Sequence, residues 1–91
     1  MTTIMIIAWN VMGLNFPNKR RDVKWVLRKY CCDAAILVES KLEEINRNIA
    51  LSFWGGRPFD WIFPPLVGRS GGIIVIWDTQ ALEYVGFFYL F

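Results

Sequence analysis

Asn10 and Glu39 are the polar residues best placed for chemistry, because each follows a short apolar run. The runs are residues 4–9 and 34–38, and a segment rich in lysine and arginine separates them. If both runs are parallel strands of one sheet, their polar ends meet at the edge where such sheets bind ligands. An amide and a carboxylate there could bind a phosphate and a metal ion. The plainer alternative is that Asn10 caps a turn and Glu39 caps a helix.

A β-α-β unit is the arrangement that would position these two residues. Residues 4–9 and 34–38 are continuously apolar, which is typical of strands covered on both faces. Between them, residues 19–30 have apolar side chains at helical spacing, with Asn18 as the expected N-cap and with lysine and arginine on the outer face. Strands joined by such a helix run parallel in the same sheet.

The chain after Glu39 predicts a second helix and then a β-hairpin. Ser40 and Glu43 have the spacing of a capping box, which indicates a helix over residues 40–51. Residues 61–63 and 73–77 are expected to pair as a hairpin with a long loop, followed by a turn at residues 78–80. Residues 84–91 predict another strand, and the chain stops inside that apolar run. This ending suggests a sequence cut off before the partner that should cover it.

Ninety-one residues suit one domain, and the high apolar content with a charged fifth argues against intrinsic disorder. A net charge of +2 does not by itself indicate a nucleic-acid-binding protein, although six basic residues cluster within residues 19–29. The adjacent Cys31 and Cys32 exclude a secreted disulfide framework. No signal peptide and no span of transmembrane length occurs. We therefore expect a soluble, intracellular protein with no membrane partner.

A glycine-rich segment, residues 68–72, is the remaining candidate for ligand binding. Its backbone amides, with Arg69 and Ser70, could contact a phosphate, but such a segment is more often a plain hairpin connection. Asp33, Asp60 and Asp78 lie at expected turns and are assigned no chemistry.

Four short motifs occur in order along the chain and together resemble one family. They are residues 8–15 (AWNVMGLN), the basic start of the first helix at residues 19–21, residues 38–41 (VESK), and residues 68–73 (GRSGGI) leading to Trp77 and Asp78. The chain resembles the start of an endonuclease/exonuclease/phosphatase domain, which has the DNase I-like fold. Within that family it is most similar to the endonuclease of plant-type non-LTR (LINE) retrotransposon polyproteins.

The resemblance implies an α/β sandwich, of which residues 1–91 would form the N-terminal portion, β-α-β-α followed by β-hairpins. It implies a catalytic role for Asn10 at the active-site hydrogen-bond network and the scissile phosphate. Glu39 would be the ligand of a catalytic Mg²⁺, for which Mn²⁺ could substitute. Lys41, Arg69 and Ser70 would be weaker nucleic-acid contacts.

The departures from the family pattern are as informative as the matches. The family commonly has Gln-Glu-Thr where this chain has Val38-Glu39-Ser40, and Met12 stands where related sequences often have a basic residue. The family's later tyrosine, Asp-x-Asn pair and terminal Ser-Asp-His element have no counterpart here, and the chain contains no histidine. The general base and its partners are therefore missing.

The sequence thus predicts a truncated, Mg²⁺-dependent endonuclease that is inactive as an isolated chain. Its full-length parent would hydrolyse a phosphodiester in DNA, in the nucleus if the retrotransposon resemblance holds. The uncovered apolar strands could cause self-association. The alternative is a non-catalytic module that binds nucleic acid or protein through the basic helix or the edge strand. Membrane association through the aromatic C-terminal stretch is disfavoured because that run is short and lacks an amphipathic helical pattern.

Overall fold

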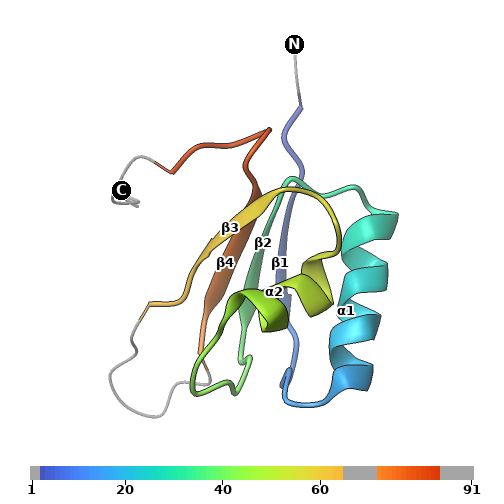
Figure 1. Ribbon diagram of the computed structural model, residues 1–91. Helices are drawn as coiled ribbons and strands as arrows, with labels where there is room; N and C mark the ends of the chain where they lie inside the picture. Colours follow the sequence, from blue (N-terminus) through green and yellow to red (C-terminus); the bar gives the residue numbers. More distant parts are fainter. Residues whose placement is uncertain (1–2, 65–71, 85–91) are drawn as a thin grey trace.

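The computed structural model describes residues 3–64 and 72–84, which form a small α/β domain with helices on one face of a mixed sheet (Figure 1). The described elements are, in chain order, β1 (Ile6–Asn10), α1 (Pro17–Lys29), β2 (Ala34–Val38), α2 (Arg47–Trp54), β3 (Phe59–Ile62) and β4 (Ile74–Asp78). Neither helix is long and apolar enough to cross a membrane within this part of the chain.

The sheet has the strand order β1-β2-β4-β3. Strands β1 and β2 are parallel, with Asn10 paired with Val38, so the predicted β-α-β unit is confirmed. Strands β3 and β4 pair antiparallel, which confirms the hairpin, and the turn predicted after Asp78 is also present. Strand β4 inserts between β2 and β3 and runs antiparallel to both. The strand predicted over residues 84–91 lies outside the described residues beyond Tyr84.

The hydrophobic core lies between the sheet and the two helices. Alternate residues of β2 and β4, such as Leu37 and Ile76, are fully buried because they face the helices. Leu27 of α1 and the aromatic pair Phe53 and Trp54 of α2 complete this core. The prediction of α1 as amphipathic is confirmed at Val23 and Leu27, which are its buried residues, whereas Tyr30 is the exposed C-cap residue.

Strand β1 differs from the prediction that both its faces are covered. It comprises Ile6–Asn10 rather than residues 4–9, it is an edge strand, and the Ile6 side chain is 55% exposed. Ile36 of β2 is also exposed on the same face of the sheet. Both helices pack on the opposite face, and within the described residues only the segment after β4, with Leu82 and Tyr84, lies over part of this one (Figure 1). An apolar run predicts burial, but it does not show which element supplies the cover.

The expected starts of both helices need correction. Phe16 is the N-cap residue of α1, with Pro17 at the first helical position, where proline loses no intrahelical hydrogen bond. Asn18 lies inside the helix, where its Oδ1 accepts from the Arg21 side chain. The second helix begins at Arg47, because the Asn46 side chain caps it by accepting from the Ile49 amide at 2.9 Å.

The predicted capping box at Ser40 and Glu43 does not form. The Ser40 hydroxyl instead accepts a hydrogen bond from the Leu42 amide at 3.3 Å, and Lys41 between them has a positive φ of 59°. A residue in the left-handed region interrupts helical φ/ψ angles, so no helix begins here. Residues 40–46 form an irregular connection that leads away from the sheet edge before α2 starts.

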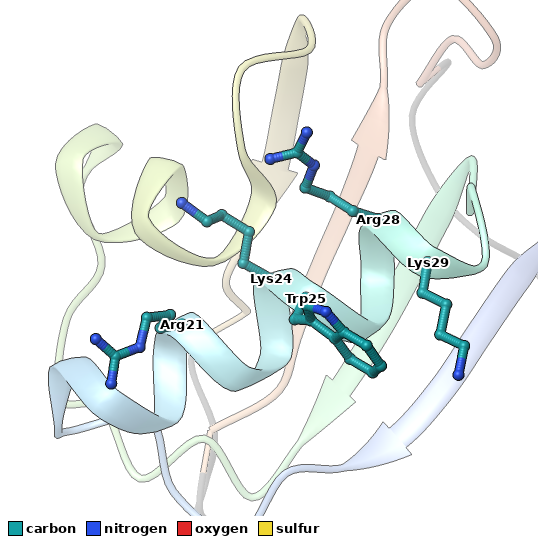
Figure 2. Close-up of a pocket in the computed structure, with 5 residues that line it drawn as sticks. All are labelled: Arg21, Lys24, Trp25, Arg28 and Lys29. Carbon is teal, nitrogen blue, oxygen red and sulfur yellow. The ribbon is translucent and has the colours of Figure 1, made fainter.

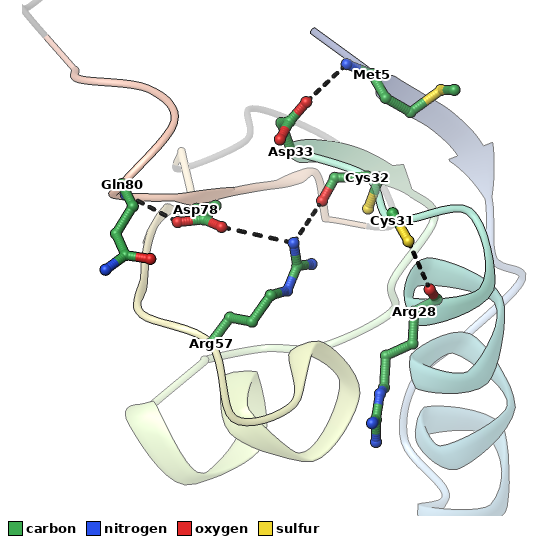
Figure 3. Close-up of polar contacts among 8 residues, drawn as sticks. All are labelled: Met5, Arg28, Cys31, Cys32, Asp33, Arg57, Asp78 and Gln80. Atoms are coloured by element: carbon green, nitrogen blue, oxygen red, sulfur yellow. Dashed lines mark hydrogen bonds and ion pairs between the residues drawn. The ribbon is translucent and has the colours of Figure 1, made fainter.

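Arg57 joins three parts of the chain near the start of β2 and the end of β4 (Figure 3). Its Nη1 donates to the Cys32 carbonyl at 3.0 Å and lies 3.5 Å from Asp78 Oδ2. Its guanidinium also covers the Trp54 ring at 4.5 Å from the centroid. Asp78 in turn accepts from the Gln80 amide, so the aspartate has a structural role, in keeping with its assignment to a turn.

We expect Arg57→Ala to lower the free energy of unfolding by about 1–3 kcal/mol, mainly through the lost hydrogen bond and ring contact. The ion pair adds little because the Arg57 side chain is 36% exposed and screened by solvent. Urea denaturation followed by circular dichroism measures the change. The matched control is Arg21→Ala on the exposed helix surface, which should change stability by less than about 0.5 kcal/mol. Equal effects of both variants would contradict the structural role of Arg57.

The two cysteines occupy different environments and are both free thiols. Cys31 is exposed, whereas Cys32 is buried in the core. Burial raises the pKa of the Cys32 thiol, and the positive charge of Arg57 opposes part of that rise. The Cys32 thiol therefore stays protonated at neutral pH and acts as a small apolar side chain.

Candidate functional site at the carboxyl edge of the parallel strands

The carboxyl ends of β1 and β2 bring Asn10 and Glu39 to the same edge of the sheet. Asn10 is the last residue of β1 and pairs with Val38, and Glu39 follows Val38 directly. Neighbouring strands are about 4.8 Å apart, so the backbones of the two residues lie close together at this edge. This is the relationship that the parallel arrangement predicted.

Three backbone hydrogen bonds hold the two loops beyond these strands together. The Val11 amide donates to the Val38 carbonyl at 3.1 Å, which extends the strand pairing by one step. The Gly13 and Leu14 amides then donate to the carbonyls of Glu39 and Ser40, both at 2.7 Å. Val11 and Leu14 are fully buried, which anchors this loop in the core. The edge is thus a fixed framework.

Gly72 brings the fourth motif of the sequence to the same place. The Ser40 amide donates to the Gly72 carbonyl at 3.0 Å, and Ser40 is fully buried. A Cβ atom on Gly72 would lie only 2.6 Å from Ser40 Oγ, so the contact requires a glycine. Gly72 also has a φ of 85°, which glycine adopts without strain. Residues 68–71, including Arg69 and Ser70, lie outside the described residues.

Three non-glycine residues at this edge have positive φ angles. Met12, Glu39 and Lys41 have φ of 56°, 55° and 59°. Each such conformation costs about 1–2 kcal/mol for an L-residue. Backbone strain of this kind concentrates at binding and catalytic sites, where the surrounding structure holds it in place. The loops therefore hold strained conformations at the residues that the sequence singled out.

The side chains of Asn10 and Glu39 are exposed and differ in their contacts. Asn10 Oδ1 accepts from the Met12 amide at 3.1 Å, which leaves its Nδ2 group without a partner among the described residues. The Glu39 carboxylate has neither an ion pair nor a hydrogen bond in the same part of the chain. Asn10 therefore does cap a turn, as the plainer alternative predicted, whereas Glu39 does not cap a helix. The Nδ2 group of Asn10 and the carboxylate of Glu39 therefore remain available to a ligand.

The neighbouring charges and donors define what this edge can bind. Lys41 is exposed, and its Cδ lies 3.7 Å from the position that a Cβ on Gly13 would take. Lys41 is therefore in the loop framework with Glu39. Residues 3–64 and 72–84 contain no cluster of three or more histidine, cysteine, aspartate or glutamate side chains that could hold a metal. This edge supplies one carboxylate, one amide and one ammonium group.

One contact and one exposed side chain were not predicted from the sequence. The hydrogen bond from Ser40 to Gly72 joins residues far apart in the chain, and no local pattern indicates it. Trp25, by contrast, was open to prediction, because it lies four residues after Arg21 and so shares the basic face of the helix. Its indole is 62% exposed on α1.

No protein-family model, curated protein or solved structure matches this chain. The described fold is a small α/β domain with a four-stranded mixed sheet and two helices. Any function for it must therefore be argued from its own residues and their arrangement.

Proposed function

We propose that this chain forms the N-terminal part of a Mg²⁺-dependent endonuclease domain with a DNase I-like α/β sandwich. Its parent would be of the plant LINE retrotransposon type and would cut a phosphodiester of nuclear DNA. The observation that carries this proposal is that Asn10, Glu39 and Gly72, from three separate motifs, lie together at one edge of the sheet. The apolar sheet face opposite the helices supports it, because a sandwich needs a second layer there.

The groups at this edge fit part of a magnesium site. Mg²⁺ is bound by one or two carboxylates and keeps several waters, so the exposed and unpaired carboxylate of Glu39 is a suitable ligand. A bound Mg²⁺ would stabilise negative charge on the phosphate and the leaving oxygen. Asn10 would donate from Nδ2 to a phosphate oxygen, since its Oδ1 is held by the Met12 amide. Lys41 would add a positive charge for the DNA backbone.

We expect that the isolated chain does not cut DNA, because the residues present do not make a complete active site. The family's later tyrosine, its Asp-x-Asn pair and its terminal Ser-Asp-His element, which would activate water and hold the phosphate, have no counterpart in the 91 residues. Glu39 acting as a metal ligand is not available as the base that activates water. We expect no Mg²⁺-dependent nicking of supercoiled plasmid by this chain, and nicking that disappears in Glu39→Gln would show that it carries a complete site.

Binding of Mn²⁺ tests the proposed metal ligand without requiring activity. Mn²⁺ should broaden the NMR amide signals of residues 10–13 and 39–41 first, because a paramagnetic ion acts on the nuclei closest to it. Glu39→Gln should weaken this binding roughly tenfold or more, since a neutral amide replaces the carboxylate that directly follows the parallel strands β1 and β2.

Glu43→Gln is the matched control for this experiment. Glu43 is an exposed carboxylate in the connection that follows Glu39, and the proposal gives it no ligand role. The Glu43→Gln chain should bind Mn²⁺ as the wild type does. If both variants weaken binding equally, or if broadening begins elsewhere, Glu39 is only one of several surface carboxylates and the proposed metal site is wrong.

A further inference from the structure

The outward face of α1 carries a cluster of positively charged side chains. Four basic residues and one indole line a hollow of about 530 Å³ on this helix (Figure 2), and we call it the α1 outer surface. It consists of Arg21, Lys24, Trp25, Arg28 and Lys29.

Helical periodicity explains why these five residues share one face. Val23 and Leu27 are fully buried against the sheet, so positions 21, 24, 25 and 28 turn toward solvent. Trp25 is therefore placed in the middle of the basic residues and away from the core. An indole that is 62% exposed leaves most of its apolar area in water, and the core packing gives no reason for it.

The positive charges of this surface are not neutralised by ion pairs with other described residues. The only ion pair of the described residues joins Arg57 to Asp78, and none of the four basic residues of the α1 outer surface takes part in one. Asp22 is the only acidic residue in α1. Lys29 Nζ lies 4.9 Å from the centroid of the Trp25 ring, so this ammonium group makes a cation–π contact with the exposed ring.

A purely structural role accounts for only part of this arrangement. The aliphatic stems of Lys24 and Arg28 lie within 4 Å of the Cβ position of Gly55, the C-cap residue of α2. Their positive charges complement the partial negative charge of that helix end. Arg21 donates to Asn18 Oδ1, and Lys29 lies over the Trp25 ring in the last turn of α1. These contacts lie on the helix surface itself, so they do not explain why a 62% exposed indole stands among four basic residues.

We propose that the α1 outer surface binds single-stranded nucleic acid. A base would stack on the exposed Trp25 ring, while Arg21, Arg28 and Lys29 contact the flanking phosphates. An aromatic ring among unpaired basic residues is the combination by which single strands are bound without sequence preference. A duplex offers its phosphates but keeps its bases stacked inside, so it would use the charges without the ring.

This surface is separate from the proposed metal site. Asn10 and Glu39 lie at the edge of the sheet where α1 begins, and the α1 outer surface extends from the first turns of that helix to its last residue, Lys29 (Figures 1 and 2). The inference does not rest on nuclease activity or on Mg²⁺. Failure of either proposal therefore leaves the other one standing.

Fluorescence anisotropy with a labelled oligothymidylate of about 12 nucleotides tests the inference, because a site of this kind covers roughly 4–16 nucleotides. The full 91-residue chain is titrated at low salt without divalent ions. We expect Trp25→Ala to weaken binding about tenfold, and Trp25→Phe to retain most of the affinity because phenylalanine also stacks on bases. Phe16→Ala is the matched control, since Phe16 is 74% exposed at the α1 N-cap and should not matter.

The charged residues are tested by the salt dependence of the same binding. Arg21→Ala and Arg28→Ala should each reduce the slope of log affinity against log salt concentration by about 0.7, the value for one single-strand phosphate. Asp22→Asn should strengthen binding about twofold to threefold because it removes the only negative charge from α1.

Three results would overturn the inference. The first is a Trp25→Ala chain that binds as well as the wild type, and the second is an abasic oligonucleotide bound as tightly as oligothymidylate. Either would show a charged surface that does not engage bases. The third is tighter binding of a duplex of equal length, which would make duplex phosphates the preferred ligand.

Discussion

Gly72→Ala is expected to lower the free energy of unfolding by about 2–5 kcal/mol, from overpacking and from forcing a left-handed backbone on alanine. The new Cβ would lie 2.6 Å from Ser40 Oγ, 3.2 Å from the Phe63 ring and 3.3 Å from the Leu42 carbonyl oxygen. The Ser40 hydroxyl can rotate, but the carbonyl belongs to the backbone and cannot. A domain of this size has only about 5–14 kcal/mol of stability, so the loss is a large share of it.

The same substitution should disturb the proposed site more than the rest of the fold. Gly72 accepts the hydrogen bond from the Ser40 amide, and Ser40 holds the loop of Gly13 and Leu14 through its carbonyl. Moving Gly72 away therefore releases the backbone next to Glu39. Binding of Mn²⁺ at Glu39 should weaken in Gly72→Ala under conditions where circular dichroism still shows folded chain.

Gly56→Ala is the matched control. Apart from its chain neighbours, no atom of the described residues lies within 4 Å of the Cβ position of Gly56, and its φ is not in the left-handed region. Stability should change by less than about 1 kcal/mol, in either direction. Chemical denaturation of the two variants gives both values. Equal losses would mean that the contact between Gly72 and Ser40 is looser than the structure indicates.

The parts of the fold that local patterns control were predicted well. The helical spacing within residues 19–30 predicted a helix, and the continuous apolar run 34–38 predicted a strand. A strand, helix and strand in succession imply parallel pairing, which the structure has. The helix starts were predicted less well, because a serine or asparagine has several competing uses. Ser40 matches a capping box in sequence, yet its hydroxyl serves a turn, and Asn46 caps the helix instead.

The site was predictable to the extent that it depends on strand ends. Asn10 and Glu39 were placed together because parallel strands end at one edge, and the structure has this arrangement. The contact between Ser40 and Gly72 depends on how β4 inserts beside β2, which is a long-range pairing. No spacing within either segment encodes it. The positive φ angles of Glu39 and Lys41 are equally invisible, since neither residue type favours that region.

The uncovered face of the sheet leads to the last prediction. Eight apolar residues from four strands share this open sheet face: Ile6, Ala8, Ala34, Ile36, Val38, Ile62, Val75 and Trp77. Leu82 and Tyr84 follow β4 and line a hollow over part of it. The remaining apolar area lies beside the free edge of β1, and such a surface promotes association between chains. We therefore expect the wild-type chain to self-associate at micromolar concentration and to show poor solubility.

Ile36→Lys should make the chain more soluble and monomeric at little cost in stability. Ile36 is 37% exposed at the centre of the open sheet face, so a lysine can extend its ammonium group into water. The expected change in the free energy of unfolding is within about 1 kcal/mol. Sedimentation velocity reports the oligomeric state, and urea denaturation reports the stability. A wild-type chain that is already monomeric, with a sharp and cooperative thermal transition, would contradict the expected self-association.

Leu37→Lys, one residue further along β2, is the control that separates the two faces of the sheet. Leu37 is fully buried against the helices, so the same lysine would lose packing and place a charge in the core. Losing the packing alone costs about 2–5 kcal/mol, and desolvating the charge adds several more. The sum is comparable to the whole stability of a domain this small, so Leu37→Lys should abolish cooperative unfolding. Because successive residues of a strand face opposite ways, neighbouring substitutions with opposite outcomes would establish that only one face of the sheet is covered.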